Sequence, residues 1–304
     1  MIVTPTDAML ADYSIHSFAK LQPFLKSYDW ILQVYMNCLT DELKRQYVSR
    51  WKRLPYVELL DNVGWFNVES IHPGEKVFFN GISSRPFEGK YEIGCMIWER
   101  EFRKMQSDYW CIVDADFEII EPYFVQHIFN TLDDEESLYV YSTDFNSKIK
   151  RYNTYTDENA FLMDRYCTWF CAYKKQCLKC ESPLYYHEEI IDGQKYVWDD
   201  TGKFQEDLQK QTNCYFKSIS QIEQIDLRNK LMYQYIHYGA FSKNKSLDSR
   251  LKIFLYRKIC LLSHRGFVIL NRKNILNKLV RFIFTKLRIY MYGSLKIERG
   301  KYHF

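Results

Sequence analysis

The pair of residues best suited to binding a divalent cation stands at the end of an apolar run. Asp114 and Asp116 follow directly on residues 109–113 (Tyr-Trp-Cys-Ile-Val), which predict a buried strand. Mg²⁺ and Mn²⁺ are hard cations that prefer oxygen ligands, and they also bind diphosphate oxygens. Ligands of α/β proteins bind outside the carboxyl ends of the strands, which is where these two carboxylates fall. The pattern therefore indicates a cation site that could neutralise a diphosphate.

The bare Asp-x-Asp pattern is short, and roughly one such match arises by chance in a chain of this length. The alternative interpretation is an acidic turn that caps the segment after the strand. The predicted strands and helices around the pair therefore have to show whether a binding site is expected there.

Short apolar runs alternate with helical patterns over the first 145 residues, which is typical of βαβ units on a parallel sheet. The predicted strands are 2–4, 30–38, 56–60, 109–113 and 138–142. Helices are expected around 14–25, after an N-cap at Thr40 as far as Trp51, and over a segment with Trp98, Phe102 and Met105 on one side. Residues 63–92 are expected to be irregular because glycine and proline interrupt them. We therefore predict an α/β fold with a mostly parallel sheet flanked by helices.

Charge divides the chain into two parts. The net charge is +4, yet residues 250–304 hold 14 Lys and Arg against the single acid Glu298, which leaves residues 1–249 with a net charge of −9. We predict one large α/β domain over residues 1–245 and a basic, amphipathic, helical appendage over residues 246–304.

The appendage shows two apolar stripes at helical spacing. The first comprises Leu247, Leu251, Phe254, Leu255, Ile259 and Leu262, with Arg250, Arg257 and Arg265 off it. The second comprises Leu276, Leu279, Val280, Ile283, Leu287 and Tyr290, with Lys278, Arg281 and Arg288 on the other side. An apolar face beside a cationic face, without the length to span a bilayer, predicts an interfacial helix on anionic lipid. Packing of these helices on the acidic domain is the alternative, and we expect no nucleic-acid partner because no recognised module is visible.

Residues 107–118, from Ser107 to Glu118, resemble the Asp-x-Asp element of the GT-A glycosyltransferases, which use nucleotide-sugar donors. The resemblance extends loosely over residues 1–245. It implies a GT-A-like fold with a nucleotide-sugar half over about 1–118, an acceptor half over about 119–245, and Mn²⁺ or Mg²⁺ as cofactor. It also implies that Asp114 lies near the donor ribose or the metal, and that Asp116 coordinates the metal. The implied activity is sugar transfer to a glycan or lipid-linked acceptor, as in bacterial surface polysaccharide or lipopolysaccharide synthesis.

The same resemblance implies positions for the nucleotide and for a third metal ligand. The implied nucleotide-binding residues are Thr4, Pro5, Thr6 and Asp7 after the first strand and Asp61 at the end of the third. Ordinary turn and cap chemistry explains these residues equally well. His237, within residues 235–240 (Tyr-Ile-His-Tyr-Gly-Ala), resembles the late histidine that completes the metal site of many such enzymes. A half-buried strand histidine is the alternative.

A carboxylate is needed in an inverting transferase to take the proton of the acceptor hydroxyl. Two acidic segments fall where the resemblance places the acceptor loop, residues 187–189 (His-Glu-Glu) and 198–202 (Trp-Asp-Asp-Thr-Gly). We favour Asp200, with its neighbour Asp199, because an aromatic residue followed by acids and glycine suits a sugar-stacking platform with a carboxylate at its edge. A solvated loop acid is the alternative. Trp169 could similarly stack on a sugar or lie in the core.

The nine cysteines stand mostly in apolar contexts, which favours reduced thiols in cytosol over a disulfide framework. Cys167, Cys171, Cys177 and Cys180 are clustered, but only the last two have metal-knuckle spacing, so structural zinc is a minor alternative. The first residues show no positive leader followed by an apolar stretch. We expect a cytoplasmic protein held peripherally at the inner face of the cell membrane.

Two other classes of protein fit parts of the sequence. A nucleotidyltransferase for sugar phosphates would need a glycine-rich phosphate loop after the first strand, and residues 5–9 (Pro-Thr-Asp-Ala-Met) hold no glycine. A non-catalytic basic adaptor for membrane or nucleic acid would use the appendage alone. The carboxylate pair favours a transferase over both.

Overall fold

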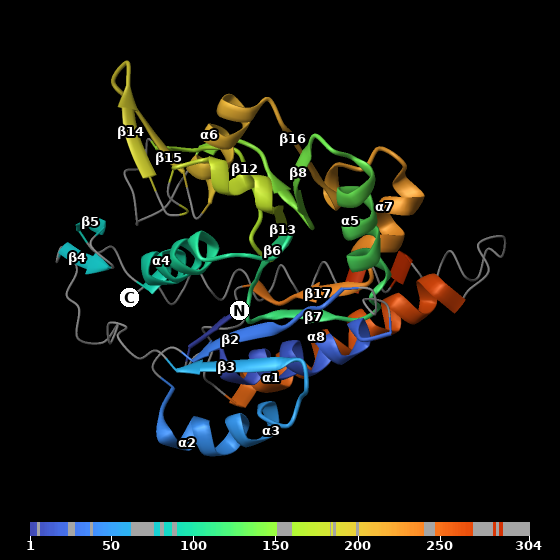
Figure 1. Ribbon diagram of the computed structural model, residues 1–304. Helices are drawn as coiled ribbons and strands as arrows, with labels where there is room; N and C mark the ends of the chain where they lie inside the picture. The colour runs from blue at the N-terminus through green and yellow to red at the C-terminus, as the bar shows by residue number, and fades with distance from the viewer. Residues whose placement is uncertain are drawn as a thin grey trace.

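A parallel sheet forms the N-terminal part of the computed structural model (Figure 1). The structure describes residues 1–4, 7–23, 28–36, 39–61, 76–79, 82–86, 90–150, 160–182, 184, 187–198, 201–239, 247–269, 282–283 and 286–287. The sheet consists of β1 (Ile2–Val3), β2 (Leu32–Met36) and β3 (Val57–Asp61), paired in the order β1-β2-β3. These strands confirm the prediction within two residues at each end.

Helices connect the three strands. Between β1 and β2 lie α1 (Ala8–Ser17) and the 3₁₀ helix η1 (Phe18–Leu21), and between β2 and β3 lie α2 (Asp41–Leu43), the π-helical turn η2 (Lys44–Val48) and α3 (Ser49–Trp51). The Thr40 side chain accepts a hydrogen bond of 3.3 Å from the Leu43 amide, which confirms the predicted N-cap. Helix α1 begins at Ala8 rather than near Ser14 as predicted, because residues 8–11 (Ala-Met-Leu-Ala) are strong helix formers.

A second sheet carries the predicted strands β6 (Tyr109–Val113) and β8 (Leu138–Ser142) at the predicted bounds. Its order is β16-β8-β13-β6, with β13 (Phe170–Lys174) and β16 (Tyr215–Ser218) as the other two strands. Strand β13 is antiparallel to both β6 and β8, so this sheet is mixed and the prediction of a mostly parallel sheet is wrong for it. Parallel neighbours need a crossover, usually a helix, and the described residues between β8 and β13 form short strands instead.

The prediction of irregular structure over residues 63–92 is also wrong in part. Strands β4 (Lys76–Phe79) and β5 (Ile82–Pro86) pair in an antiparallel manner, and α4 (Lys90–Arg103) begins within the same range. The two residues between the strands are Asn80 and Gly81, a dipeptide typical of tight hairpins. Here glycine and proline lie at or near the ends of paired strands rather than in a long irregular segment.

The second half of the chain adds short strands and helices around the mixed sheet. The strands are β7 (Phe117–Ile119), β9 (Phe145–Asn146), β10 (Ile149–Lys150), β11 (Phe161–Leu162), β12 (Arg165–Tyr166), β14 (His187–Ile191), β15 (Gln194–Trp198) and β17 (Tyr235–His237). The helices are α5 (Tyr123–Asp134), η4 (Lys175–Lys179), α6 (Gly202–Thr212), η5 (Ile219–Gln221) and α7 (Ile225–Met232).

One hydrophobic core joins the parallel sheet to the mixed sheet. It contains Ile15 of α1, Val34 of β2, Phe117 of β7, Phe124 of α5 and Phe170 of β13, all at most 2% exposed. Because β7 contributes to this core directly after Asp116, the carboxylate pair stands on well-packed structure.

Helix α8 (Leu247–Ile269) packs on the α/β domain, beside α1 in Figure 1. Its inward face buries Ile253, Tyr256 and Cys260 against Leu10 and Ile236. Arg257, expected on a cationic outer face, points inward and pairs with Glu118 at 2.6 Å. Among the described residues, no helix is both long and apolar enough to cross a bilayer.

Candidate metal centre

Two short strands hold the carboxylate pair beside His237. Asp114 and Asp116 occupy the turn between β6 and β7, and β7 pairs antiparallel with β17, so that Phe117 lies opposite His237. The Tyr238 amide donates to the Asp116 carbonyl at 2.9 Å, and the Asp114 amide donates to the Trp169 carbonyl at 3.1 Å. Backbone pairing therefore brings together residues that are about 120 positions apart in the chain.

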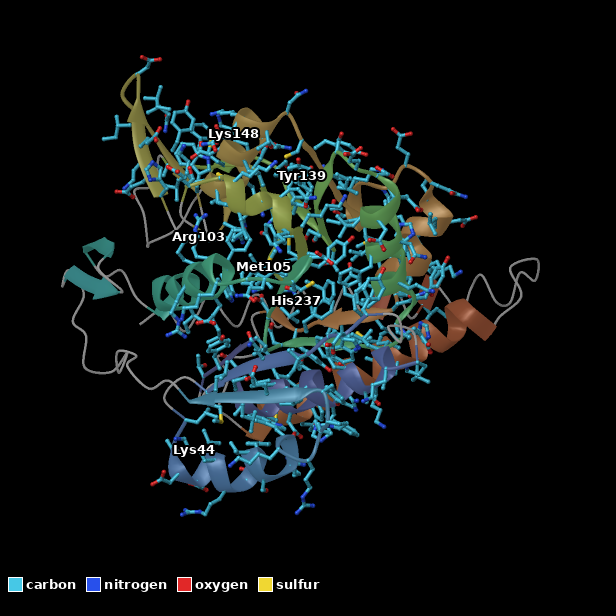
Figure 2. All side chains as sticks on the ribbon, viewed as in Figure 1. Lys44, Arg103, Met105, Tyr139, Lys148 and His237 are labelled. Carbon is cyan, nitrogen blue, oxygen red and sulfur yellow. The ribbon has the colours of Figure 1, made fainter. Side chains whose placement is uncertain are left out.

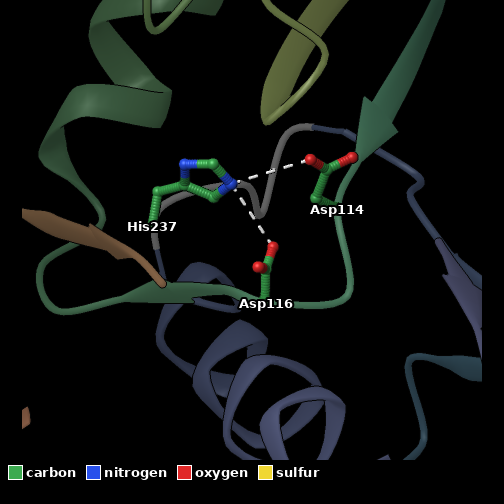
Figure 3. A group of neighbouring side chains, drawn as sticks. All are labelled: Asp114, Asp116 and His237. Carbon is green, nitrogen blue, oxygen red and sulfur yellow. Dashed lines mark ion pairs between the residues drawn. The ribbon is translucent and has the colours of Figure 1, made fainter. Parts of the chain in front are cut away.

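The three side chains converge (Figure 3). His237 Nε2 lies 3.4 Å from Asp116 Oδ1 and 3.7 Å from Asp114 Oδ2. One ligand atom from each residue lies within 4.8 Å of the other two, and within the described part of the chain this is the one such group of three acidic, histidine or cysteine side chains. Asp116 and His237 are mostly buried, whereas the Asp114 side chain keeps 28% of its surface exposed.

Electrostatics in the site favour a bound cation. Desolvation, followed by the charge of Asp116, raises the pKa of Asp114 to about 6. Burial of the His237 imidazole acts to lower its pKa, but the carboxylates of Asp116 and Asp114 outweigh burial, and its pKa is raised. Two carboxylates that repel each other in a desolvated turn are relieved by positive charge between them.

The donor set fits Mn²⁺ or Mg²⁺. Asp114 and Asp116 offer hard oxygen ligands, and a neutral His237 offers a nitrogen that suits Mn²⁺. Three protein ligands would leave coordination positions open for a diphosphate. The structure therefore brings together the three residues that the sequence suggested as metal ligands.

Trp169 completes the wall of the site. Its ring stacks on the His237 imidazole with centroids 4.0 Å apart and planes at 26°. It also packs against the main core, and its carbonyl fixes the Asp114 backbone. Trp169 thus orients a candidate ligand, and this face of its ring is covered by His237 instead of being open to a sugar.

Two further charged residues act on the site, although the sequence did not indicate them. The positive charge of Arg165 on β12 counteracts the rise of the Asp114 pKa, and the negative charge of Asp144 contributes to the raised pKa of His237. Neither residue stands in a motif, and both come from segments that only the fold brings to the metal centre. No sequence signal could have found them.

The predicted nucleotide-binding residues are only partly within the described chain. The Thr4 hydroxyl donates a hydrogen bond to the Asp7 carboxylate, and the charge of Asp7 adds to the raised pKa of Asp114. Asp61 ends β3, and its side chain lies outside the described part. Pro5 and Thr6 also lie outside the described residues. Binding of a nucleotide by these five residues stays a prediction.

The predicted base, Asp200, and its neighbour Asp199 lie outside the described residues. The adjacent Trp198 is only 3% exposed, and its indole N–H donates to the Glu206 carboxylate. The interpretation of Trp198 as an open sugar-stacking platform is therefore wrong, because its ring belongs to the fold.

The other acidic segment lies on β14, far from β7 and β17 in Figure 1. There Glu188 pairs with Lys195 at 3.0 Å, and Glu189 lies 2.7 Å from His187. Both acids have local partners on the β14–β15 hairpin.

Cys167, Cys171, Cys177 and Cys180 are free and buried. Desolvation raises the pKa of the Cys167 thiol to about 12 and also raises the pKa of the Cys180 thiol. Within the described residues they do not gather into a possible metal-binding group, which favours packed thiols over structural zinc.

A cavity of about 1420 Å³ lies between β2, α4 and β6. Its lining includes Gln33, Trp98, Tyr109 and Asp133 but not Asp114, Asp116 or His237. Val113, which directly precedes Asp114, is part of the lining, so the cavity reaches the strand that carries the carboxylate pair.

No family model matches the chain, and no curated protein matches its sequence. Among solved structures, the chain is similar to the mannosyltransferase PcManGT from Pyrobaculum calidifontis, in complex with GDP-Man and Mn²⁺. The TM-score is 0.37 and the sequence identity is 11%, with 98% of this chain and 83% of that chain covered. Because both values are low, the function proposed below is based on the geometry of the site.

Proposed function

We propose that this chain is a metal-dependent glycosyltransferase that moves a sugar from a nucleotide-sugar donor to a glycan or glycolipid acceptor. The observation that carries the proposal is the convergence of Asp114, Asp116 and His237 at the carboxyl end of β6. Ligands of α/β proteins bind at such strand ends. Synthesis of a surface polysaccharide or lipopolysaccharide is the process we propose for it.

Each site residue has a defined task in this proposal. Asp114 and Asp116 offer oxygen ligands, and Trp169 holds the His237 ring so that its nitrogen faces them. A bound Mn²⁺ or Mg²⁺ would supply charge neutralisation for a departing nucleoside diphosphate. The loop after β1, with Thr4, Pro5, Thr6 and Asp7, and Asp61 at the end of β3 are proposed to hold the nucleotide.

The alternatives are less well supported. A sugar-phosphate nucleotidyltransferase needs a glycine-rich phosphate loop, which the residues after β1 do not supply. A basic adaptor without catalysis gives no reason for two carboxylates and a histidine to converge at a strand end, where α/β proteins bind their ligands.

A thermal-shift panel tests the proposed function. The full chain is heated with UDP-, GDP- and CMP-sugars, each with and without Mn²⁺. A ligand that binds the folded state raises the melting temperature, so we expect one nucleotide class to do so only when Mn²⁺ is present. No shift with any combination would contradict the proposal.

Asp200 is proposed as the base that takes the acceptor proton. Asp200→Asn is then expected to lower turnover by about 100-fold, since general-base catalysis contributes at least that much. The measurement is release of nucleoside diphosphate with saturating donor. Turnover within a few-fold of the wild type would remove Asp200 from this role, and a large loss in Glu188→Gln instead would assign the base to β14.

A membrane surface is the partner we propose for the basic appendage, at the cytoplasmic face of the cell membrane. The outward face of α8 exposes four large apolar side chains beside the exposed Lys258, namely Leu251, Phe254, Leu255 and Leu262. Residues 250–304 carry 14 basic residues and one acid, which complements anionic lipid. The other face of α8 packs on the α/β domain. One helix can therefore contact the domain with one face and lipid with the other.

We expect the double variant Phe254→Glu/Leu255→Glu to bind phosphatidylglycerol-containing vesicles at least about tenfold more weakly than the wild type, because it loses apolar contact and gains repulsion. Cosedimentation is the measurement, with pure phosphatidylcholine vesicles as the neutral reference. Ile190→Glu/Ile191→Glu, which changes two exposed residues on the distant β14, is the matched control. Equal vesicle binding by all three proteins would rule out docking through α8.

A further inference from the structure

A buried ion pair joins α8 to the strands of the metal centre. Arg257 contacts the Glu118 carboxylate with two nitrogens, Nε at 2.8 Å and Nη2 at 2.6 Å. The Tyr238 hydroxyl donates to the same carboxylate at 2.5 Å. The side chain of Glu118 is 2% exposed and Tyr238 is fully buried. The three residues form a buried polar cluster that links α8 to β7 and to the residue after β17.

This cluster stands directly behind the candidate metal ligands. Glu118 follows Asp116 by two positions on β7, and Tyr238 follows His237. The Tyr238 amide also donates to the Asp116 carbonyl. The side chains of Glu118 and Tyr238 thus connect the same two backbone segments that hold Asp116 and His237.

Short strands need such support. β7 and β17 have three residues each, and they pair with each other in a two-stranded sheet. A two-stranded ribbon of this length is marginal in isolation, so its register depends on packing and on side-chain links. Glu118 is a buried carboxylate, and loss of Arg257 would remove the ion pair it forms, which is destabilising locally even though the charge of Lys20 and the Tyr238 hydroxyl remain.

Arg257 is in turn held in place. Its guanidinium lies 4.6 Å from the centre of the Tyr13 ring of α1, and the neighbouring Tyr256 and Cys260 are buried against the domain. A planar guanidinium that forms two parallel bonds to a carboxylate fixes geometry as well as charge.

We propose that Arg257 is a positioning residue which, through Glu118 and Tyr238, sets the separation of Asp116 and His237 and thereby the affinity of the site for a divalent cation. This proposal shares with the proposed function the binding of Mn²⁺ at the site, and it does not depend on sugar transfer. Arg257 itself touches neither the cation ligands nor a substrate.

Mn²⁺ binding to the full chain, followed by the electron paramagnetic resonance signal of free Mn²⁺, tests this role. Arg257→Gln is expected to weaken Mn²⁺ binding by about tenfold, as loss of partners behind metal ligands commonly does. Arg257→Lys keeps the charge without the paired geometry and is expected to recover part of the affinity. Circular dichroism and the melting temperature report whether each variant is folded.

Arg103→Gln is the matched control. Arg103 pairs with Glu99 at 2.8 Å, and the two pairs are similarly buried, with 29% of the Arg103 side chain exposed and 27% of the Arg257 side chain. Arg103 lies on α4, and Figure 2 labels it together with His237. Loss of stability without loss of Mn²⁺ affinity is expected for Arg103→Gln. The same Mn²⁺ affinity in folded Arg257→Gln as in the wild type would overturn the proposal.

If Arg257→Gln does not fold, Tyr238→Phe tests the same link, because it removes only the hydroxyl that donates to Glu118. A several-fold weaker affinity for Mn²⁺ supports the linkage, and an unchanged affinity overturns it. Absence of Mn²⁺ binding by the wild type would contradict the proposed function itself, whereas wild-type binding with unaffected variants contradicts the positioning role alone.

Discussion

Asp116→Asn is expected to lower metal-dependent sugar transfer by about 10³-fold, the scale of losing a main electrostatic contact to a leaving group. Asparagine has the same shape as aspartate, so the change removes a charge and not a contact. Asp116 is mostly buried, and its Oδ1 lies 3.4 Å from His237 Nε2. Mn²⁺ affinity should fall with turnover because one hard oxygen ligand becomes neutral. Nucleoside diphosphate release and Mn²⁺ titration measure the two effects.

Asp192→Asn serves as the control for the same chemical change. Asp192 is exposed in the β14–β15 turn with φ of 52°, a conformation that asparagine adopts as readily. Turnover of this variant should equal that of the wild type. If Asp116→Asn retained more than about a tenth of the wild-type turnover, Asp116 could not be a main cation ligand.

Phe117→Ala is expected to cost about 3–5 kcal/mol of folding free energy, the range for removal of a buried phenylalanine. The Phe117 ring is fully buried, with its centroid 5.0 Å from that of Tyr235 and 6.0 Å from that of Phe124. Its removal would leave a void under the turn that carries Asp116. For a chain of this size, the loss corresponds to a melting temperature lower by about 10 °C.

Tyr123→Ala is the comparison for Phe117→Ala, since Tyr123 lies six residues further along the chain, at the start of α5, but keeps 40% of its surface exposed. Its loss should cost less than about 1 kcal/mol. Denaturant unfolding of both variants measures the difference. Equal costs would mean that the core under the metal centre is not packed as described.

Local pattern predicted much of the fold. The apolar run 109–113 and the run 138–142 form strands at those bounds, because short apolar segments between turn signals have few other ways to be buried. The direction of β13 could not be predicted, since antiparallel pairing with both β6 and β8 depends on the path of the chain between them.

The grouping of Asp114, Asp116 and His237 was predicted from the residues and the resemblance together, and the structure brings the three side chains together. Asp114 and Asp116 are separated by one residue at a strand end, so their proximity follows from the local sequence. The approach of His237 depends on pairing between β7 and β17, which no local pattern encodes. The stacking of Trp169 on His237 could not be predicted either, because it also depends on the position that β17 takes in the fold.

Helix α8 shows why an amphipathic pattern can mislead. Apolar residues lie on two faces, Ile253 and Tyr256 inward and Leu251 and Phe254 outward, so hydrophobic spacing could not tell which face meets the domain. The buried charge of Glu118, which needs a cation, places Arg257 inward.

Crystals of the protein soaked with Mn²⁺ and the nucleotide that gives the largest thermal shift test the central claim most directly. We expect an anomalous peak coordinated by Asp114, Asp116 and His237, with diphosphate oxygens on its open side. A Mn²⁺ peak elsewhere, with these three side chains uncoordinated, would contradict the account.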